Sequence, residues 1–148
     1  MDHRGTFVGT PLYASPEMLS NSVSGPFTDL WALGVIVYFI VTGEPPWRGN
    51  QEYAVFKQIL ERHIIFPTTM PIDAVDLVDK LLQLNPLKRL GAGKEGTDLD
   101  FKSLKAHPFF KNLNFDRISN GSIAPPIPES MFEKAIEISK EEHKDAYE

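Results

Sequence analysis

The sequence contains no cysteine among its 148 residues. Without cysteine the chain can form no disulfide framework, no thiolate zinc site and no cysteine nucleophile. This composition suits the reducing environment of the cell interior, so we expect a cytoplasmic location. The four histidines lie far apart with no spacing typical of ligands, and the sequence therefore predicts no metal site.

A long hydrophobic run is also missing. The longest, residues 30–41, is well short of the roughly 20 apolar residues that cross a bilayer, and the first residues lack the apolar core of a signal peptide. Lys and Arg are in the minority, with a net charge of -5, and nucleic-acid affinity depends largely on clustered basic residues. The sequence therefore predicts neither membrane insertion nor secretion, and no nucleic-acid partner.

Apolar residues make up 42% of the chain and charged residues 24%, which is typical of a soluble globular protein with its own core. No internal repeat and no strand pattern of any length is present, so we expect a mainly α fold. The clearest apolar stretch predicts a helix from Thr28, as its N-cap, to Thr42, with Gly43 just past the end. This helix is apolar on nearly every face, so we expect protein to surround it.

Three further helices are predicted. The first covers residues 51–62 behind an Asn50 cap and has one apolar face. The second begins at an Asp73 cap and has apolar residues at helical spacing up to its end before Asn85 and Pro86. A third, short helix is expected near residues 101–106, where a following proline stops it.

The two ends of the chain have different compositions. Residues 1–26 are rich in Gly, Ser, Thr and Pro, which predicts a loop with a short turn near residues 16–19. Residues 112–128 contain three prolines and are expected to be extended, as a linker or tail. Residues 129–148 are rich in charged residues and have apolar residues on one side at helical spacing, which predicts a charged amphipathic helix. The expected organisation is a globular domain over residues 1–111, the Pro-rich segment 112–128, and the helix 129–148.

Three sequence features together resemble a known family. The segment Gly9–Glu17 has the sequence GTPLYASPE, Thr28–Gly34 has the sequence TDLWALG, and Arg89 follows much later. In this order they resemble the end of the activation segment, the central helix and a buried arginine of the eukaryotic protein kinases. The resemblance covers roughly residues 4 to 128. It implies the helical C-terminal lobe of the protein kinase fold, without the N-terminal β lobe and the catalytic loop.

Further features narrow the resemblance. His107–Phe110, with the sequence HPFF, and the Pro-rich segment after it are similar to the AGC group of serine/threonine kinases. Thr6–Thr10, with the sequence TFVGT, and Ser15–Glu17, with the sequence SPE, are most similar to the phosphoinositide-dependent protein kinases.

The resemblance assigns expected roles to residues of the first loop. Thr6 stands where that family carries an activation-loop phosphate, which would add nearly two negative charges and order the loop through arginines. Thr10 and Tyr13 would shape the pocket for the substrate residue that follows the phosphoacceptor. The alternatives are an ordinary solvated hydroxyl for Thr6 and a packed aromatic ring for Tyr13.

The resemblance also assigns structural roles. Glu17 and Arg89 match a buried ion pair that fastens the activation segment to the helical lobe. Asp29 matches an aspartate that holds backbone amides of the catalytic loop, while its place at the start of a helix also favours a capping role. Trp31 and Trp47 are expected to be packing residues.

Several residues that a complete kinase needs are not found in this sequence. It has no His-Arg-Asp, no Asp-Phe-Gly and no Val-Ala-Ile-Lys-like strand, so we assign no catalytic and no cofactor-binding residue. The segment Gly91–Gly96, with the sequence GAGKEG, has the spacing of a nucleotide loop. It follows a helix and an arginine, however, whereas such a loop needs a preceding strand. The chain alone is therefore expected neither to bind Mg-ATP nor to transfer phosphate.

The sequence thus leads to a part of a serine/threonine kinase that transfers the γ-phosphate of ATP to Ser or Thr of protein substrates, with ATP and Mg²⁺ as cofactors of the complete enzyme. Other AGC kinases are the candidate substrates. The alternative is a non-catalytic kinase-like module, whose docking helices and Pro-rich segment engage a kinase, a substrate or an SH3-like partner. An unrelated helical bundle is a weaker reading, because the motifs occur in the order of the kinases.

Overall fold

The computed structural model describes residues 11–21 and 23–123. The chain divides after Asn112 into two units, which are described separately. All regular elements of the described residues are helical, which confirms the mainly α class. The first unit contains η1 (Pro11–Tyr13), α1 (Pro16–Asn21), α2 (Pro26–Thr42), α3 (Glu52–Leu60), α4 (Ile72–Leu81), η2 (Pro86–Lys88), α5 (Phe101–Lys105) and η3 (Pro108–Phe110). The second contains α6 (Phe115–Ser119).

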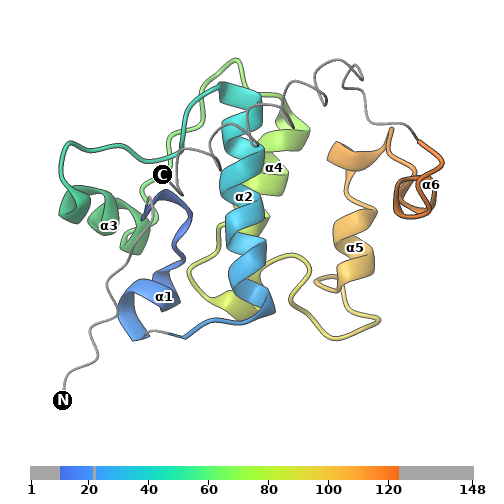
Figure 1. Ribbon diagram of the computed structural model, residues 1–148, viewed down its shortest axis with the longest axis horizontal. Coiled ribbons are helices and arrows are strands. Elements are labelled where there is room, and N and C mark those ends of the chain that lie inside the picture. Colours follow the sequence, from blue (N-terminus) through green and yellow to red (C-terminus); the bar gives the residue numbers. More distant parts are fainter. Residues whose placement is uncertain (1–10, 22, 124–148) are drawn as a thin grey trace, which may run out of the picture. The chain divides into compact units, whose positions relative to one another are not determined.

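Helix α2 is the centre of the first unit. Helix α4 packs along it, α1 and α3 lie to one side, and α5 lies to the other (Figure 1). The α2–α4 contact is close because Gly34 has no side chain; a Cβ there would lie 2.8 Å from Leu82 Cδ2. The core is formed by apolar side chains of both helices, including Leu30, Trp31, Val35, Val37, Tyr38, Ala74, Leu77, Val78 and Leu81.

The start of α2 differs from the prediction. The helix begins at Pro26 with Gly25 as its N-cap, so Thr28 is the third helical residue and not the cap. Proline suits the first position of a helix, because its fixed φ is helical and its missing N–H would have no partner there. Thr28 still takes part in capping, since its Oγ1 accepts a hydrogen bond from the Gly25 N–H at 3.1 Å. The end is as predicted: Gly43 has a φ of 77° and donates its N–H to Phe39 O at 2.8 Å.

One face of α2 is open in the described residues. Ile36, Phe39 and Ile40 are 42%, 44% and 73% exposed. Among the described residues, protein therefore does not cover this face of the helix, although its other faces contribute to the core. None of the described helices is long and apolar enough to cross a membrane.

The next two helices are shorter than the sequence predicted. Helix α3 begins at Glu52, and Gln51 rather than Asn50 is its N-cap. Helix α4 begins at Ile72 after Pro71, so Asp73 lies in the first turn and does not cap the helix. The reason is that Pro71 itself can precede the helix, with its fixed φ of -55°.

The loop after α4 and helix α5 have side-chain caps. Asn85 does not close α4 but caps η2, accepting a hydrogen bond from the Leu87 N–H at 3.0 Å. Asp100 accepts from the Ser103 N–H at 2.7 Å and so starts α5, which ends at Lys105.

The second unit corrects another expectation. Residues 112–128 were expected to be extended, but Phe115–Ser119 form α6. Asn114 explains this, because its side chain accepts a hydrogen bond from the Arg117 N–H at 3.0 Å and caps the helix. The helix predicted for residues 129–148 lies outside the described residues.

Candidate functional site

The most strongly connected polar site in the first unit is an ion pair between α1 and the residue after η2. The Nη1 of Arg89 lies 2.7 Å from Glu17 Oε1, and Nη2 lies 2.7 Å from Oε2. The two side chains are 0% and 9% exposed, and the residues are 72 positions apart. Arg89 also donates to the carbonyls of Gln83, at 2.9 Å, and Phe27, at 2.7 Å. The guanidinium thus joins α1, the start of α2 and the end of α4 at one point.

The environment of Glu17 stabilises its charged form. Burial alone would raise the pKa of this carboxyl, but its hydrogen bonds, first those from Arg89, outweigh burial. The pKa of Glu17 therefore lies below its ordinary value of 4.5. Glu17 is ionised at neutral pH, which a buried pair with arginine requires.

Two tryptophans connect this ion pair with η1. The Arg89 guanidinium lies 5.0 Å from the centre of the Trp31 ring, and Trp31 stacks on Trp47 with ring centres 5.5 Å apart. The indole N–H of Trp47 donates to the backbone oxygen of Leu12 at 3.0 Å. Both tryptophans are buried, as the sequence predicted.

The residues expected in the substrate pocket lie at η1 or before it. Tyr13 is the last residue of η1 and is 44% exposed, so its ring is half available to a partner. Thr6 and Thr10 lie outside the described residues. The structure thus describes only one side of the expected pocket.

Asp29 lies in the first turn of α2 and is exposed. The cap of this helix is formed by Gly25 with Thr28, so the capping role that the sequence allowed for Asp29 is filled by its neighbour. Asp29 faces a cavity of about 410 Å³. The other lining residues are Pro26, Phe27, Leu30, Gly91, Ala92 and Phe101.

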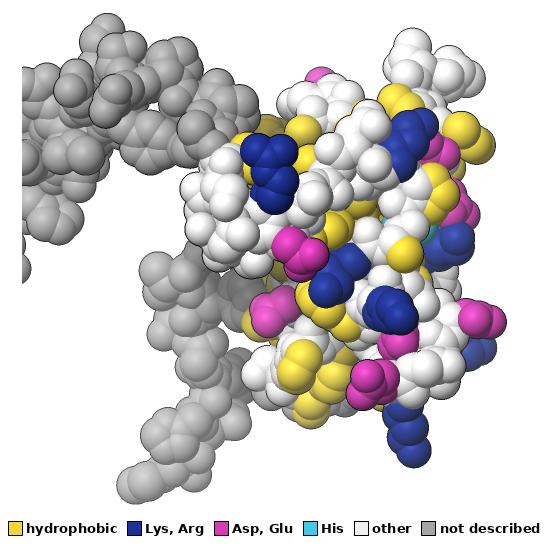
Figure 2. All heavy atoms as spheres, turned by 90° about the vertical axis from the view of Figure 1, so that its right-hand side faces the viewer, with side chains coloured by type: hydrophobic (Ala, Val, Ile, Leu, Met, Phe, Trp, Pro, Cys, Tyr) yellow, Lys and Arg dark blue, Asp and Glu magenta, His cyan; other side chains and the backbone are white. Residues whose placement is uncertain are grey.

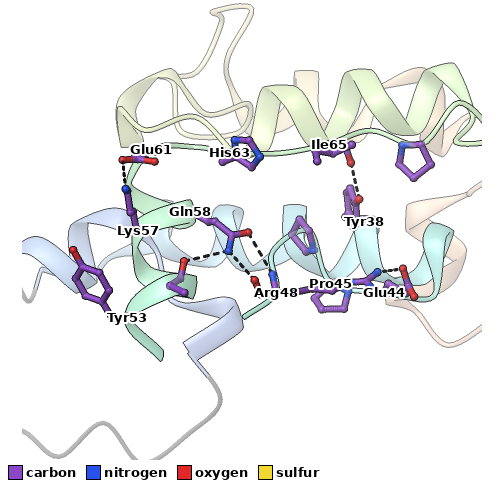
Figure 3. A pocket seen from close by; sticks show the side chains of 13 residues that line it. Tyr38, Glu44, Pro45, Arg48, Tyr53, Lys57, Gln58, Glu61, His63 and Ile65 are labelled. Carbon is purple, nitrogen blue, oxygen red and sulfur yellow. Dashed lines mark hydrogen bonds and ion pairs between the residues drawn. The ribbon is translucent and has the colours of Figure 1, made fainter. Parts of the chain in front are cut away.

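A larger cavity, of about 730 Å³, lies between the end of α2, helix α3 and residues 63–67 (Figure 3). The Tyr38 hydroxyl donates to Ile65 O at 2.7 Å, and the Gln58 amide donates to Arg48 O at 2.7 Å. Its charged side chains form two ion pairs, Glu44 with Arg48 and Lys57 with Glu61. Because each cation has an acidic partner, the cavity offers a mixed polar and apolar wall and no excess of either charge.

Residues 91–96 do not form a phosphate site. The Gly96 N–H donates to Asp100 Oδ2 at 2.9 Å. Hydrogen bonds from the backbone N–H groups of Ser103 and Gly96 are the main reason that the pKa of Asp100 is lowered. An amide that a phosphate would need is therefore already bonded to a carboxylate, whose charge repels phosphate.

Within residues 11–21 and 23–123, no cluster of His, Asp and Glu side chains could hold a metal ion. The described residues on the face shown in Figure 2 carry acidic and basic side chains interspersed with hydrophobic ones. This face therefore presents no field of a single sign.

The contact of a buried histidine, His107, with the half-exposed Asp76 was missed by the sequence analysis. His107 Nε2 lies 2.8 Å from Asp76 Oδ2, and its Nδ1 accepts a hydrogen bond from the Phe109 N–H at 3.2 Å. Because Nδ1 is an acceptor, the network assigns the ring proton to Nε2, which donates to Asp76. Lys80 also contacts Asp76 at 2.6 Å. Hydrogen bonds from Lys80 first, and then from His107, hold the pKa of Asp76 below its ordinary value of 3.8.

The comparison with known families agrees with this architecture. The protein kinase domain family matches residues 2–110, which is most of the chain. The chain belongs to this family, and its described helices from η1 to η3 are those of the helical C-terminal lobe.

Relatives similar to this chain are protein kinases by name. A probable serine/threonine-protein kinase, pdkA, of Dictyostelium discoideum is 40% identical over 136 residues, which are 92% of this chain and 20% of that protein. Human 3-phosphoinositide-dependent protein kinase 1 is 43% identical over 114 residues, or 76% of this chain and 20% of that protein. Protein kinase C-like 2 of Schizosaccharomyces pombe is 38% identical over 82% of this chain and 12% of that protein. The chain spans about a fifth or less of the length of these relatives.

Proposed function

We propose that these residues act as the C-terminal lobe of a serine/threonine kinase of the AGC group, which transfers the γ-phosphate of ATP to Ser or Thr of protein substrates. The observation that carries the proposal is the buried ion pair of Glu17 and Arg89. It fastens α1, which begins with the last two residues of the sequence GTPLYASPE, to the helical body, in a chain that the protein kinase domain family matches over residues 2–110. An unrelated helical bundle has no need for this pair.

Within the proposed kinase, the first loop meets the substrate. Thr10 and Tyr13 would form the pocket for the residue after the phosphoacceptor, and the half-exposed ring of Tyr13 supports this role. Thr6 would carry a regulatory phosphate. Tyr53 and Leu60, one helical face of α3, are 76% and 43% exposed and would contribute to docking of the substrate protein.

Asp29 would connect this lobe with the catalytic loop of the complete enzyme. Its carboxylate is exposed at the start of α2, where it can accept hydrogen bonds from backbone amides. ATP and Mg²⁺ would be held by residues outside this chain, because neither residues 91–96 nor the acidic residues of the described part suit them. This lobe would position the protein substrate.

The remaining parts of the proposal concern the substrates, the location, the domain organisation and a further partner of the enzyme. Other AGC kinases in the cytoplasm would be its substrates. The expected organisation is the lobe at residues 1–111, the tail 112–128 and a terminal helix 129–148. Pro125–Pro128, with the sequence PPIP, would suit a partner that binds polyproline segments.

The test has two arms. Titration of the 148-residue chain with Mg-ATP should show no saturable binding, and the complete reading frame from the native transcript should phosphorylate Ser or Thr in protein substrates. Mass spectrometry of the active enzyme should find phosphate on Thr6. The opposite result would be a transcript with an in-frame stop codon immediately before Met1 and a native protein that transfers no phosphate. It would support the non-catalytic binding module instead.

A further inference from the structure

We infer that Trp47 is a positioning residue for the substrate pocket, acting through its indole N–H rather than only through its ring. The inference rests on the proposed function, because it assumes that η1 with Tyr13 contacts the substrate. Trp47 lies in the connection between α2 and α3, 35 positions from Leu12. Its hydrogen bond of 3.0 Å to Leu12 O acts on the backbone of the residue that precedes Tyr13.

The indole is itself held in place. Trp47 is 1% exposed and stacks on Trp31 at 5.5 Å with an angle of 19° between the rings. Trp31 in turn packs under the Arg89 guanidinium, which is fixed by Glu17. Because every link is buried, the Trp47 N–H is a fixed donor, and η1 is fixed with it.

Few other hydrogen bonds could hold η1 in place of the bond from Trp47 to Leu12 O. Residues 11–13 form a single 3-10 turn, and such a short turn gains little from its own hydrogen bonds. The backbone oxygen of Leu12 would lose its indole donor in a Trp47→Phe variant, whereas the aromatic stack on Trp31 would remain. The N–H and the ring can thus be tested separately.

The experiment compares Trp47→Phe with a matched control, Tyr38→Phe. The control also removes one donor from a buried aromatic side chain, but its bond goes to Ile65 O, away from η1. In the 148-residue chain, hydrogen exchange of the amides at residues 12–14 should become several-fold faster in Trp47→Phe only. Urea unfolding should show that both variants remain folded.

In the complete kinase, Trp47→Phe should raise the KM for a peptide substrate about fivefold, the size expected from one neutral hydrogen bond, with kcat and the KM for ATP unchanged. Tyr38→Phe should leave the peptide KM unchanged. Unaltered exchange at residues 12–14, or an unaltered peptide KM in an active enzyme, would overturn the inference. A native protein without any kinase activity would instead refute the proposed function, while the exchange experiment would still decide whether Trp47 holds η1.

Discussion

Arg89 donates to both carboxylate oxygens of Glu17 at 2.7 Å, inside a lobe that leaves the arginine side chain no exposed surface. Replacing Arg89 by alanine would leave a buried carboxylate without its counter-charge. We expect Arg89→Ala to lower the free energy of unfolding by roughly 3 to 5 kcal/mol, measured by urea denaturation.

The matched control is Arg48→Ala. Arg48 also pairs with a glutamate, Glu44, but both side chains are 58% exposed. Exposed pairs contribute at most about 1 kcal/mol. Equal losses for the two variants would show that the Arg89 pair is not desolvated in solution, and the argument for a buried fastening of α1 would fail.

Acid should weaken the fold through the same carboxylate. The pKa of Glu17 is lower in the folded protein than its ordinary value, so the stabilisation is present above that ordinary value and is lost as the pH falls through the folded pKa. We expect unfolding midpoints to decrease as the pH falls below the ordinary value of 4.5. In Glu17→Gln this decrease should be smaller, since one of the shifted groups is gone. An unchanged pH profile in that variant would contradict the assignment.

The contribution of Asp76 to the free energy of unfolding can be measured against that of Asp73, another acidic residue of α4. Asp76→Ala would leave the buried Nε2–H of His107 without an acceptor, which costs about 1 to 3 kcal/mol. Asp73→Ala, on the same helix, removes a longer contact of 3.5 Å to the exposed Lys111 and should cost less than about 1 kcal/mol. Thermal unfolding of both variants measures the difference, and a larger loss in Asp73→Ala would argue against the His107 network.

Helical periodicity was enough to predict the core side of α4. Ala74, Leu77, Val78, Leu81 and Leu82 recur at helical spacing, and all of them are 0% exposed. A regular apolar spacing places these side chains on one side of a helix, and that side packs into the core whatever the rest of the fold is. Helix starts were less certain, because several residues near one start can cap it. Pro26 at the first position therefore moved the beginning of α2 ahead of Thr28.

The candidate site depends on contacts that no local pattern contains. Glu17 and Arg89 were paired only through the resemblance to kinases, because residues 72 positions apart leave no periodic signal. The contact of Asp76 with His107 had no signal at all, since an ordinary carboxylate on an amphipathic helix gives no indication of a partner 31 residues later. Helix α6 had a usable signal, the Asn114 cap, which the prolines at positions 125, 126 and 128 of the same segment obscured.

The last prediction concerns the close contact of α2 and α4 at Gly34. A methyl group there would lie 2.8 Å from Leu82 Cδ2 and 3.0 Å from Leu81 Cβ, so the Leu82 side chain or the helices would have to shift. We expect Gly34→Ala to lower the free energy of unfolding by roughly 1 to 3 kcal/mol through overpacking. Leu82→Ala alone, which empties a fully buried site, should cost roughly 2 to 5 kcal/mol.

The double variant decides whether the two effects have one cause. If the alanine methyl at position 34 clashes with the Leu82 side chain, shortening that side chain removes the clash. The double variant should then lose less stability than the sum of the single variants, by at least about 0.5 kcal/mol. Strictly additive losses in urea denaturation would mean that Gly34 and Leu82 do not touch in solution, and that α2 and α4 pack less closely than described.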